Sequence, residues 1–430
     1  MRVLDLNNET KQELLKNLLN RNPGSYSEYE ASVNEIINNV RTYKDKALFD
    51  YTLKFDKCEI SADTIRVTQE EIDAAEKELD PKFIEVMKKS AENIRIFHEK
   101  QKRNTWIDTK DDGSILGQRI LPIEISGVYV PGGKAAYPSS VLMNVVPAKV
   151  AGVERIIMCT PPGKDGKVNP GTLVAAKIAG VNEVYKVGGA QAIAAMAFGT
   201  ESIPKVDKIT GPGNIFVALA KKACFGHVSI DSIAGPSEIL VLADETANAR
   251  YVAADLLSQA EHDELASAIL ITTSKKLADD VVLEIEGFLK TLERAEIIKK
   301  SLDNYGFIFI AENMDDAVDA TNAVASEHLE IITENPFETM TKVKNAGAIF
   351  LGQYSSEPLG DYFAGPNHIL PTNSTARFFS PLNVDDFMKK TSIISYSKDA
   401  LYKVHEDIEL FAKKEGLTAH ANSIAVRFEN

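Results

Sequence analysis

Cysteine is scarce in this chain, with three residues in 430, which is too few for a disulfide framework. Cys58, Cys159 and Cys224 are an odd number and form no paired motif, so we expect three buried thiols in a reducing compartment. Apolar runs of membrane-spanning length are also missing, and the polar, helix-like segment 1–20 lacks the apolar core of a signal peptide. These absences predict a cytoplasmic protein without a membrane partner.

Basic residues are outnumbered, because 48 Lys and Arg face 62 Asp and Glu and give a formal net charge of −14. An acidic surface repels phosphate backbones, which argues against a nucleic acid partner. Hydrophobic residues make up 44% of the chain, enough for a sizeable core. The length suggests two or three domains.

The glycine pattern G-x-G-x-x-G, which normally follows the first strand of a dinucleotide fold, is absent as well. Three other glycine turns could bind a phosphate, at 131–133, 188–191 and 211–214. The last two lie between a predicted strand and a predicted helix, where backbone N–H groups attract an anion. Each turn is weak support by itself, because glycine in such a turn often serves conformation alone. Three in one block favour a nucleotide site.

The pattern from residue 121 onward is a repeated alternation of short apolar runs and helical segments, typical of βαβ units and a parallel sheet. We therefore expect an α/β fold with two Rossmann-like parallel-sheet domains, at 121–236 and 237–380. AGVERI (151–156) and AGVNEV (179–184) each place a glycine between a helix and a strand, where a left-handed C-cap is needed.

The two ends of the chain do not show this alternation of apolar runs and helical segments. Residues 1–120 favour a mainly helical region, partly packed on the second domain, with a short strand at 65–67 and a capping box from Thr68 to Glu71. Residues 381–430 form a small tail with a predicted strand at 391–396 and a predicted helix at 398–415. The tail has little core of its own, so we expect it to pack on another domain or subunit.

Potential metal ligands begin in the segment 230–262, IDSIAGPSEILVLADETANARYVAADLLSQAEH. Gln259 and His262 are three residues apart, so on a helix they share a face and could reach one ion. Asp361 and His420 could add a carboxylate and a second imidazole, a donor set that suits zinc. Spacing alone supports this site only moderately, because the four residues are scattered and a glutamine at a helix end is usually solvated.

Glu327 and His328 are an adjacent acid and imidazole at the predicted end of a helix. Neighbours on a helix point about 100° apart, yet at a helix end both can line one pocket. The alternative is a pair of ordinary polar residues on the surface. The residues alone leave this open.

The segment 230–262 closely resembles the signature of histidinol dehydrogenases, zinc enzymes that oxidise L-histidinol to L-histidine with NAD, and the resemblance runs from about residue 121 to the end. It implies that Glu327 and His328 are catalytic, that NAD and Zn2+ are cofactors, and that the tail completes the site of a homodimer. The implied NAD contacts are Tyr129, Gln191 and Asn214; the implied metal ligands are Gln259, His262, Asp361 and His420; the implied substrate contacts are Ser237, Gln259, His262, His328, Asp361, His368, Glu415 and His420.

The chemistry implied by this resemblance is a four-electron oxidation through L-histidinal, the last two steps of histidine biosynthesis. His328 would act as the base for the alcohol, and Glu327 would activate water for the aldehyde. No cysteine lies in a reactive-looking loop, so a hydrated aldehyde fits better than a thiol adduct. The alternatives are a related zinc- and NAD-dependent dehydrogenase for another amino alcohol, and a non-catalytic metal- or nucleotide-binding protein.

Overall fold

The computed structural model describes residues 1–21, 27–132 and 137–429, and the chain forms two compact units. Unit 1 comprises Met1–Gln101 and Glu124–Phe387, and unit 2 comprises Lys102–Ile123 and Met388–Asn430. Unit 1 contains two parallel sheets, which confirms the predicted α/β fold with two Rossmann-like sheets. In the described ranges, none of the helices is long and apolar enough to span a membrane.

The first sheet of unit 1 has five parallel strands in the order β6-β5-β4-β7-β8. Strands β4 to β7 are mostly buried, whereas the edge strand β8 is not, and Gly152 and Gly180 adopt the predicted left-handed C-caps. All three cysteines are buried thiols, as expected. The elements are β4 (Ile125–Tyr129), α6 (Pro138–Ala151), β5 (Arg155–Cys159), α7 (Pro170–Ala179), β6 (Glu183–Tyr185), α8 (Gly189–Phe198), β7 (Lys208–Thr210), α9 (Ile215–Cys224) and β8 (Ser229–Ile230).

Four helices from the N-terminal region cover this first sheet: α2 (Ser27–Tyr43), α3 (Asp45–Asp56), α4 (Gln69–Glu78) and α5 (Pro81–Glu99). α2 and α3 pack against α8 and α9, while α4 and α5 pack against α6 and α7. The predicted helical region is interrupted at Lys44, with φ 53°, and at Asp80 before Pro81. The capping box at Thr68 is confirmed, whereas the strand expected at 65–67 is an isolated bridge from Arg66 to Tyr185.

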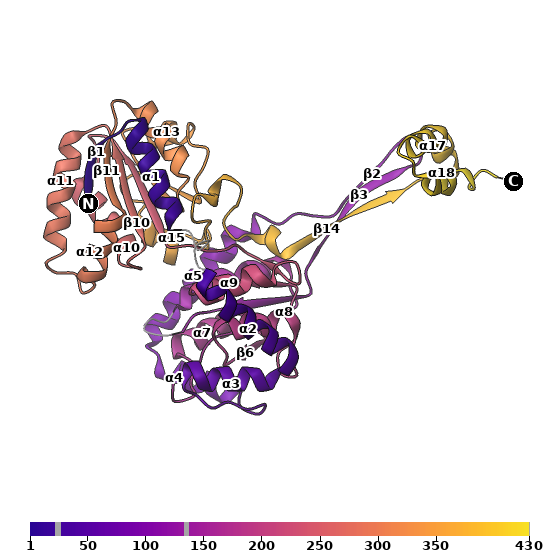
Figure 1. Ribbon diagram of the computed structural model, residues 1–430, viewed down its shortest axis with the longest axis horizontal. Helices are drawn as coiled ribbons and strands as arrows, with labels where there is room; N and C mark the ends of the chain where they lie inside the picture. The colour runs from indigo at the N-terminus through magenta and orange to yellow at the C-terminus, as the bar shows by residue number, and fades with distance from the viewer. Residues whose placement is uncertain (22–26, 133–136, 430) are drawn as a thin grey trace. The chain divides into compact units, whose positions relative to one another are not determined.

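The second sheet has six parallel strands in the order β1-β11-β10-β9-β12-β13. α10, α11 and α12 cover one face, and α1 and α13 cover the other (Figure 1). The elements are β1 (Arg2–Asp5), α1 (Asn8–Asn20), β9 (Glu238–Ala243), α10 (Ala249–Ala260), β10 (Ser267–Thr272), α11 (Lys275–Phe288), α12 (Ala295–Tyr305), β11 (Gly306–Ile310), α13 (Met314–Val324), β12 (His328–Ile332), α14 (Pro336–Met340), β13 (Ala348–Leu351) and α15 (Glu357–Tyr362).

The first residues of the chain are an exception to the expected helix. Residues 2–5 form β1, which pairs in parallel with β11 at the edge of the second sheet, and the helix starts only at Asn8. Asn7 accepts hydrogen bonds from the N–H groups of Glu9 and Thr10, which explains where α1 begins.

Unit 2 combines a three-stranded antiparallel sheet, in the order β14-β3-β2, with three helices. β2 (Trp106–Thr109) and β3 (Ile115–Pro122) were not expected; β3 pairs with the tail strand β14 (Met388–Ser395) on one side and with β2 on the other. The single tail helix that was expected is divided into α16 (Lys398–Tyr402) and α17 (His405–Lys414), and α18 (Thr418–Ala425) follows. Residues 102–123 therefore belong with the tail and not with the helical region before them.

Candidate active site

Polar and charged side chains gather at the amino edge of the second sheet, where β9 and β12 begin side by side. Helices alternate with parallel strands, so the ends of helices meet the starts of strands at this edge. His262 follows the end of α10 and interacts electrostatically with His328, His368 and Glu357. Asp361, on α15, interacts in the same way with Glu327. The structure thus brings six polar residues, from four separate segments of the sequence, into one cluster.

Glu327 and His328 do not end a helix, as the sequence suggested, but begin a strand. α13 ends at Val324 because Ala325 adopts a left-handed conformation, with φ 51°. His328 is the first residue of β12 and lies opposite Ile239 of β9 in the parallel register. Both side chains are buried, which excludes the interpretation as ordinary surface residues.

The backbone of Glu238 holds both side chains. Its N–H donates to Glu327 Oε2 at 2.9 Å, and its carbonyl oxygen lies 3.0 Å from His328 Nδ1. A carbonyl oxygen can only accept, so Nδ1 carries the hydrogen of a neutral imidazole. Within the described residues, His328 Nε2 is buried and has no hydrogen-bond partner. Its lone pair is therefore free to accept a proton.

Burial shifts the pKa of each member of the pair. Loss of solvent lowers the pKa of His328 to about 4, with smaller contributions from His262 and His368, so the imidazole is neutral near pH 7. Loss of solvent raises the pKa of Glu327 well above its usual value, and the nearby carboxyls of Glu238 and Asp361 raise it further. The Glu327 carboxylate is thereby made a stronger base than an exposed carboxylate.

Two carboxyl groups on α15 lie beside this pair. Glu357 and Asp361 hydrogen-bond to each other, and burial raises the pKa of Glu357 to about 8 and that of Asp361 to about 6. Ligand atoms of Glu357, Asp361 and His328 all lie within 4.8 Å of one another. Buried carboxylates repel one another with little solvent to screen them, so a shared proton or a bound cation is required to stabilise the group.

The residues fit a divalent cation. Gln259 is 1% exposed, and its Oε1 has no hydrogen-bond partner in the described part of the chain. A buried amide oxygen that accepts no hydrogen bond destabilises the folded protein unless a ligand binds to it. Nδ1 of His368 is likewise buried without a hydrogen bond among these residues, 3.6 Å from Asp361 Oδ1. Oxygen and imidazole donors of this kind are those that zinc accepts.

The other substrate contacts that the resemblance implied are distributed over both units. Ser237 is half-buried and directly precedes β9, next to the residue that holds Glu327 and His328. Glu415 and His420 lie in unit 2, where they line one cavity of about 410 Å³ between α17 and α18. That cavity is otherwise mainly apolar, with Ile408, Phe411 and Leu417 in its wall.

The glycine turns lie at the carboxyl edge of the first sheet. β4 is the central strand, and the chain leaves it toward β5 on one side and reaches β7 on the other, so a topological switch point lies between β4 and β7. Ligands of open parallel sheets bind at such points. The turn at 131–133 follows β4, although Gly133 lies outside the described residues, and the turn at 211–214 follows β7.

The three expected NAD contacts surround this point. Tyr129 ends β4, and its hydroxyl accepts a hydrogen bond of 3.1 Å from the N–H of Gly189. Gln191 is buried, and its Oε1 has no partner among the described residues. Asn214 is exposed and caps α9 by accepting hydrogen bonds from the N–H groups of Phe216 and Val217.

A cavity of about 630 Å³ adjoins the turn at 131–133. Its wall includes residues 131–132 and 160–165, together with the start of α7. The volume is suited to part of a dinucleotide.

Sequence inspection missed two buried acids of the cluster, Glu238 and Glu357. Glu238 starts an apolar strand and Glu357 precedes a proline, so each resembles an ordinary surface acid at the end of an element. Glu238 could have been noticed as a charge directly before the buried run Ile239–Ala243.

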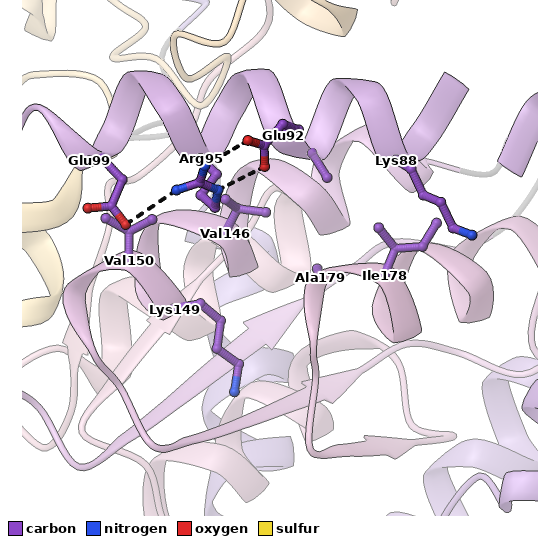
Figure 2. Close-up of a pocket in the computed structure, with 10 residues that line it drawn as sticks. Lys88, Glu92, Arg95, Glu99, Val146, Lys149, Val150, Ile178 and Ala179 are labelled. Atoms are coloured by element: carbon purple, nitrogen blue, oxygen red, sulfur yellow. Dashed lines mark hydrogen bonds and ion pairs between the residues drawn. The ribbon is translucent and has the colours of Figure 1, made fainter. Parts of the chain in front are cut away.

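Another cavity, of about 320 Å³, lies between α5, α6 and α7 and is unrelated to the expected residues. Figure 2 shows Arg95 between Glu92 and Glu99, with ion pairs to both. Val146, Val150 and Ile178 supply apolar wall. Because both acids in its wall are paired with Arg95, we assign this cavity no ligand.

Comparison with known proteins identifies the family. The family model described as histidinol dehydrogenase matches residues 19–428. A histidinol dehydrogenase of Halalkalibacterium halodurans is 59% identical over 93% of this chain and 94% of its own length, and one of Clostridium acetobutylicum is 57% identical over 97% and 96%. A crystal structure of histidinol dehydrogenase from Elizabethkingia anophelis superposes with a TM-score of 0.93 at 39% identity, covering 99% of this chain and 98% of that one. This chain therefore belongs to the histidinol dehydrogenase family.

Proposed function

We propose that this protein oxidises L-histidinol to L-histidine through L-histidinal, with NAD as the electron acceptor and zinc as the metal, in the last two steps of histidine biosynthesis. The observation that carries the proposal is the buried Glu327–His328 pair beside Asp361, in a chain that belongs to this family. Each oxidation removes two electrons, so one substrate reduces two NAD, consumes one water and releases three protons.

His328 is the proposed base for the first oxidation. Its Nδ1–H is bound to the Glu238 carbonyl, so the free Nε2 points the lone pair of a neutral imidazole into the site. Removal of the hydroxyl proton by this nitrogen pushes electrons toward the carbon that loses hydride. The low pKa of His328, about 4, keeps the nitrogen unprotonated at neutral pH.

Glu327 is the proposed base for the second oxidation, in which the aldehyde must first add water. Its carboxyl is anchored through Oε2 by the N–H of Glu238. Because burial and neighbouring acids raise its pKa, it can take a proton from water and release it again within one turnover. Cys58, Cys159 and Cys224 are all buried, which supports hydration and not a thiol adduct.

Gln259, His262 and Asp361 would hold the zinc ion, with His420 as the fourth ligand. Gln259 Oε1, which has no hydrogen-bond partner among the described residues, and the raised pKa of Asp361 support this assignment, because a cation would satisfy both groups. Zinc would orient the imidazole and amine of the substrate. Ser237, His368 and Glu415 would complete the substrate contacts. The carboxylates of Asp361 and Glu415 suit a cationic amine.

Tyr129, Gln191 and Asn214 would bind NAD at the switch point of the first sheet. The helix start behind each turn offers N–H groups for the pyrophosphate. His420 and Glu415 belong to unit 2, whereas the other proposed ligands belong to unit 1. We therefore retain the proposal that unit 2 completes the active site of a partner subunit in a homodimer.

The alternative is a related dehydrogenase for another amino alcohol. One assay distinguishes it from the proposed function: the amount of NADH formed per L-histidinol consumed, measured with and without a chelator. Two NADH per substrate, lost on chelation and restored by zinc, is the expected result. One NADH with free aldehyde would indicate a simple alcohol dehydrogenase. A zinc-loaded protein that forms no NADH would disprove the proposal and direct the search to other amino alcohols.

A further inference from the structure

We infer that Arg21 and Glu238 form a buried positioning pair that holds Glu327 and His328 in the orientation needed for the reaction. The inference rests on the proposed function for those two side chains. Arg21 follows α1, and Glu238 begins β9, so the pair joins the N-terminal segment to the centre of the second sheet.

The first step of the argument concerns the backbone of Glu238. β9 and β12 pair in parallel, and the first residue of β12 lies opposite Ile239. Glu238 lies one residue before this point, so its peptide groups extend beyond the paired residues of the two strands. The carboxylate of Glu327 and the imidazole of His328 take the places of the missing backbone partners, at 2.9 and 3.0 Å. A rotation of this one residue would therefore displace both side chains at once.

The second step concerns the side chain of Glu238, which resists that rotation. Arg21 donates to Glu238 Oε1 at 2.7 Å, and the N–H of Asn373 donates to the same oxygen at 3.2 Å. Arg21 also donates to the carbonyl oxygen of Leu265, at 2.9 Å, in the turn before β10. The Glu238 carboxylate thus binds two other segments of unit 1 directly, and Arg21 links it to a third.

The third step is energetic. The side chains of Arg21 and Glu238 are 0% and 3% exposed, so both charges have lost nearly all of their hydration. A buried ion pair of this kind is often no more stable than apolar residues of similar size. Its presence at the start of an apolar strand is therefore poorly explained by stability and well explained by a requirement for fixed geometry. Arg21 and Glu238 act through their neighbours, so they are positioning residues and not catalytic ones.

The test is the double variant Arg21→Met with Glu238→Leu, which replaces the pair by apolar side chains of similar volume. We expect it to fold with a melting temperature within a few degrees of the parent, and to lose at least about tenfold in kcat for L-histidinol. The KM for NAD should stay within about twofold, because the proposed nucleotide turns belong to the first sheet. The matched control is Lys208→Met with Asp386→Leu, which removes an ion pair of 3.1 Å at the start of β7 and should leave kcat within about twofold.

A second readout does not depend on turnover. In protein labelled with 15N-histidine, the signal of His328 is assigned by its loss in His328→Asn, and the parent should show the Nδ1–H tautomer. The double variant should show a mixture of tautomers or a shifted pKa. If it folds poorly, the single variants Arg21→Lys and Glu238→Gln replace it, and the first should retain more kcat than Arg21→Met. A folded double variant with parental kcat and an unchanged tautomer would overturn the inference. A parent without histidinol oxidation would overturn the proposed function instead, and the tautomer would still test the positioning.

Discussion

His328 shows how burial and a single hydrogen bond together prepare a base. Burial removes the solvent that would stabilise an imidazolium, and the Glu238 carbonyl assigns the remaining hydrogen to Nδ1. We predict that His328→Asn lowers kcat by roughly 10²- to 10⁴-fold, because asparagine can still donate to that carbonyl but cannot accept the substrate proton. Steady-state kinetics measure the loss. His227→Asn, an exposed histidine that packs on Phe198, is the control and should retain parental activity. A His328 variant within tenfold of the parent would rule out its role as base.

The Gln259 side chain is proposed to favour zinc binding while it lowers the stability of the metal-free protein. Its buried Oε1 has no donor among the described residues, so Gln259→Leu removes an unsatisfied group at little change in volume. We predict that the metal-free variant melts at the parental temperature or higher. Its affinity for zinc should fall by at least about tenfold, and the rise in melting temperature on adding zinc should shrink accordingly. Calorimetry with and without zinc measures both effects, and Gln353→Leu, on an exposed loop, is the control. If Gln259→Leu bound zinc with the parental affinity, Gln259 would not be a metal ligand.

At the scale of elements, the turn after β7 depends on one glycine. Gly211 has φ 117°, and a Cβ there would lie 2.0 Å from the carbonyl oxygen of Tyr129. We predict that Gly211→Ala displaces the turn from β4, raises the KM for NAD several-fold and costs about 1–3 kcal/mol of stability. Gly226→Ala is the matched control, since Gly226 has φ 97° with no described atom within 4 Å of its Cβ position. A similar loss of NAD binding in both variants would mean that backbone strain, and not this contact, is responsible.

The elements also show what could be read from the sequence. The predicted alternation of apolar runs and helical segments is confirmed by strands such as β5 and β13, because an apolar run bounded by glycine or a charged residue defines them locally. β1 and β3 were not predicted, because their partners β11 and β14 lie far away in the sequence, and β2 pairs only with β3. The site follows the same rule. The resemblance nominated Glu327, His328 and Asp361, whereas Glu238 and Glu357 became visible only once folding had brought them to the same edge.

At the scale of the whole molecule, the proposed ligands are divided between two units whose sheets share no strand. The small unit exposes apolar side chains on its helices, with Phe411 69% and Leu410 57% exposed. Exposed apolar residues around a cavity that contains Glu415 and His420 are the composition expected of a surface that another chain covers. Symmetric homodimers would bury two copies of this surface at once.

Mixing two inactive variants tests whether the sites are shared. If each site combines His328 of one subunit with His420 of the other, a heterodimer of His328→Asn and His420→Asn has one site with both defects and one intact site. Random reassembly makes about half of the dimers heterodimers, so the mixture should recover about a quarter of parental activity. Activity after joint unfolding and refolding measures the recovery, and each variant refolded alone is the control. If both histidines served the same subunit, every site would keep one defect and the mixture would remain inactive, so the recovered quarter is specific to a site built by two chains.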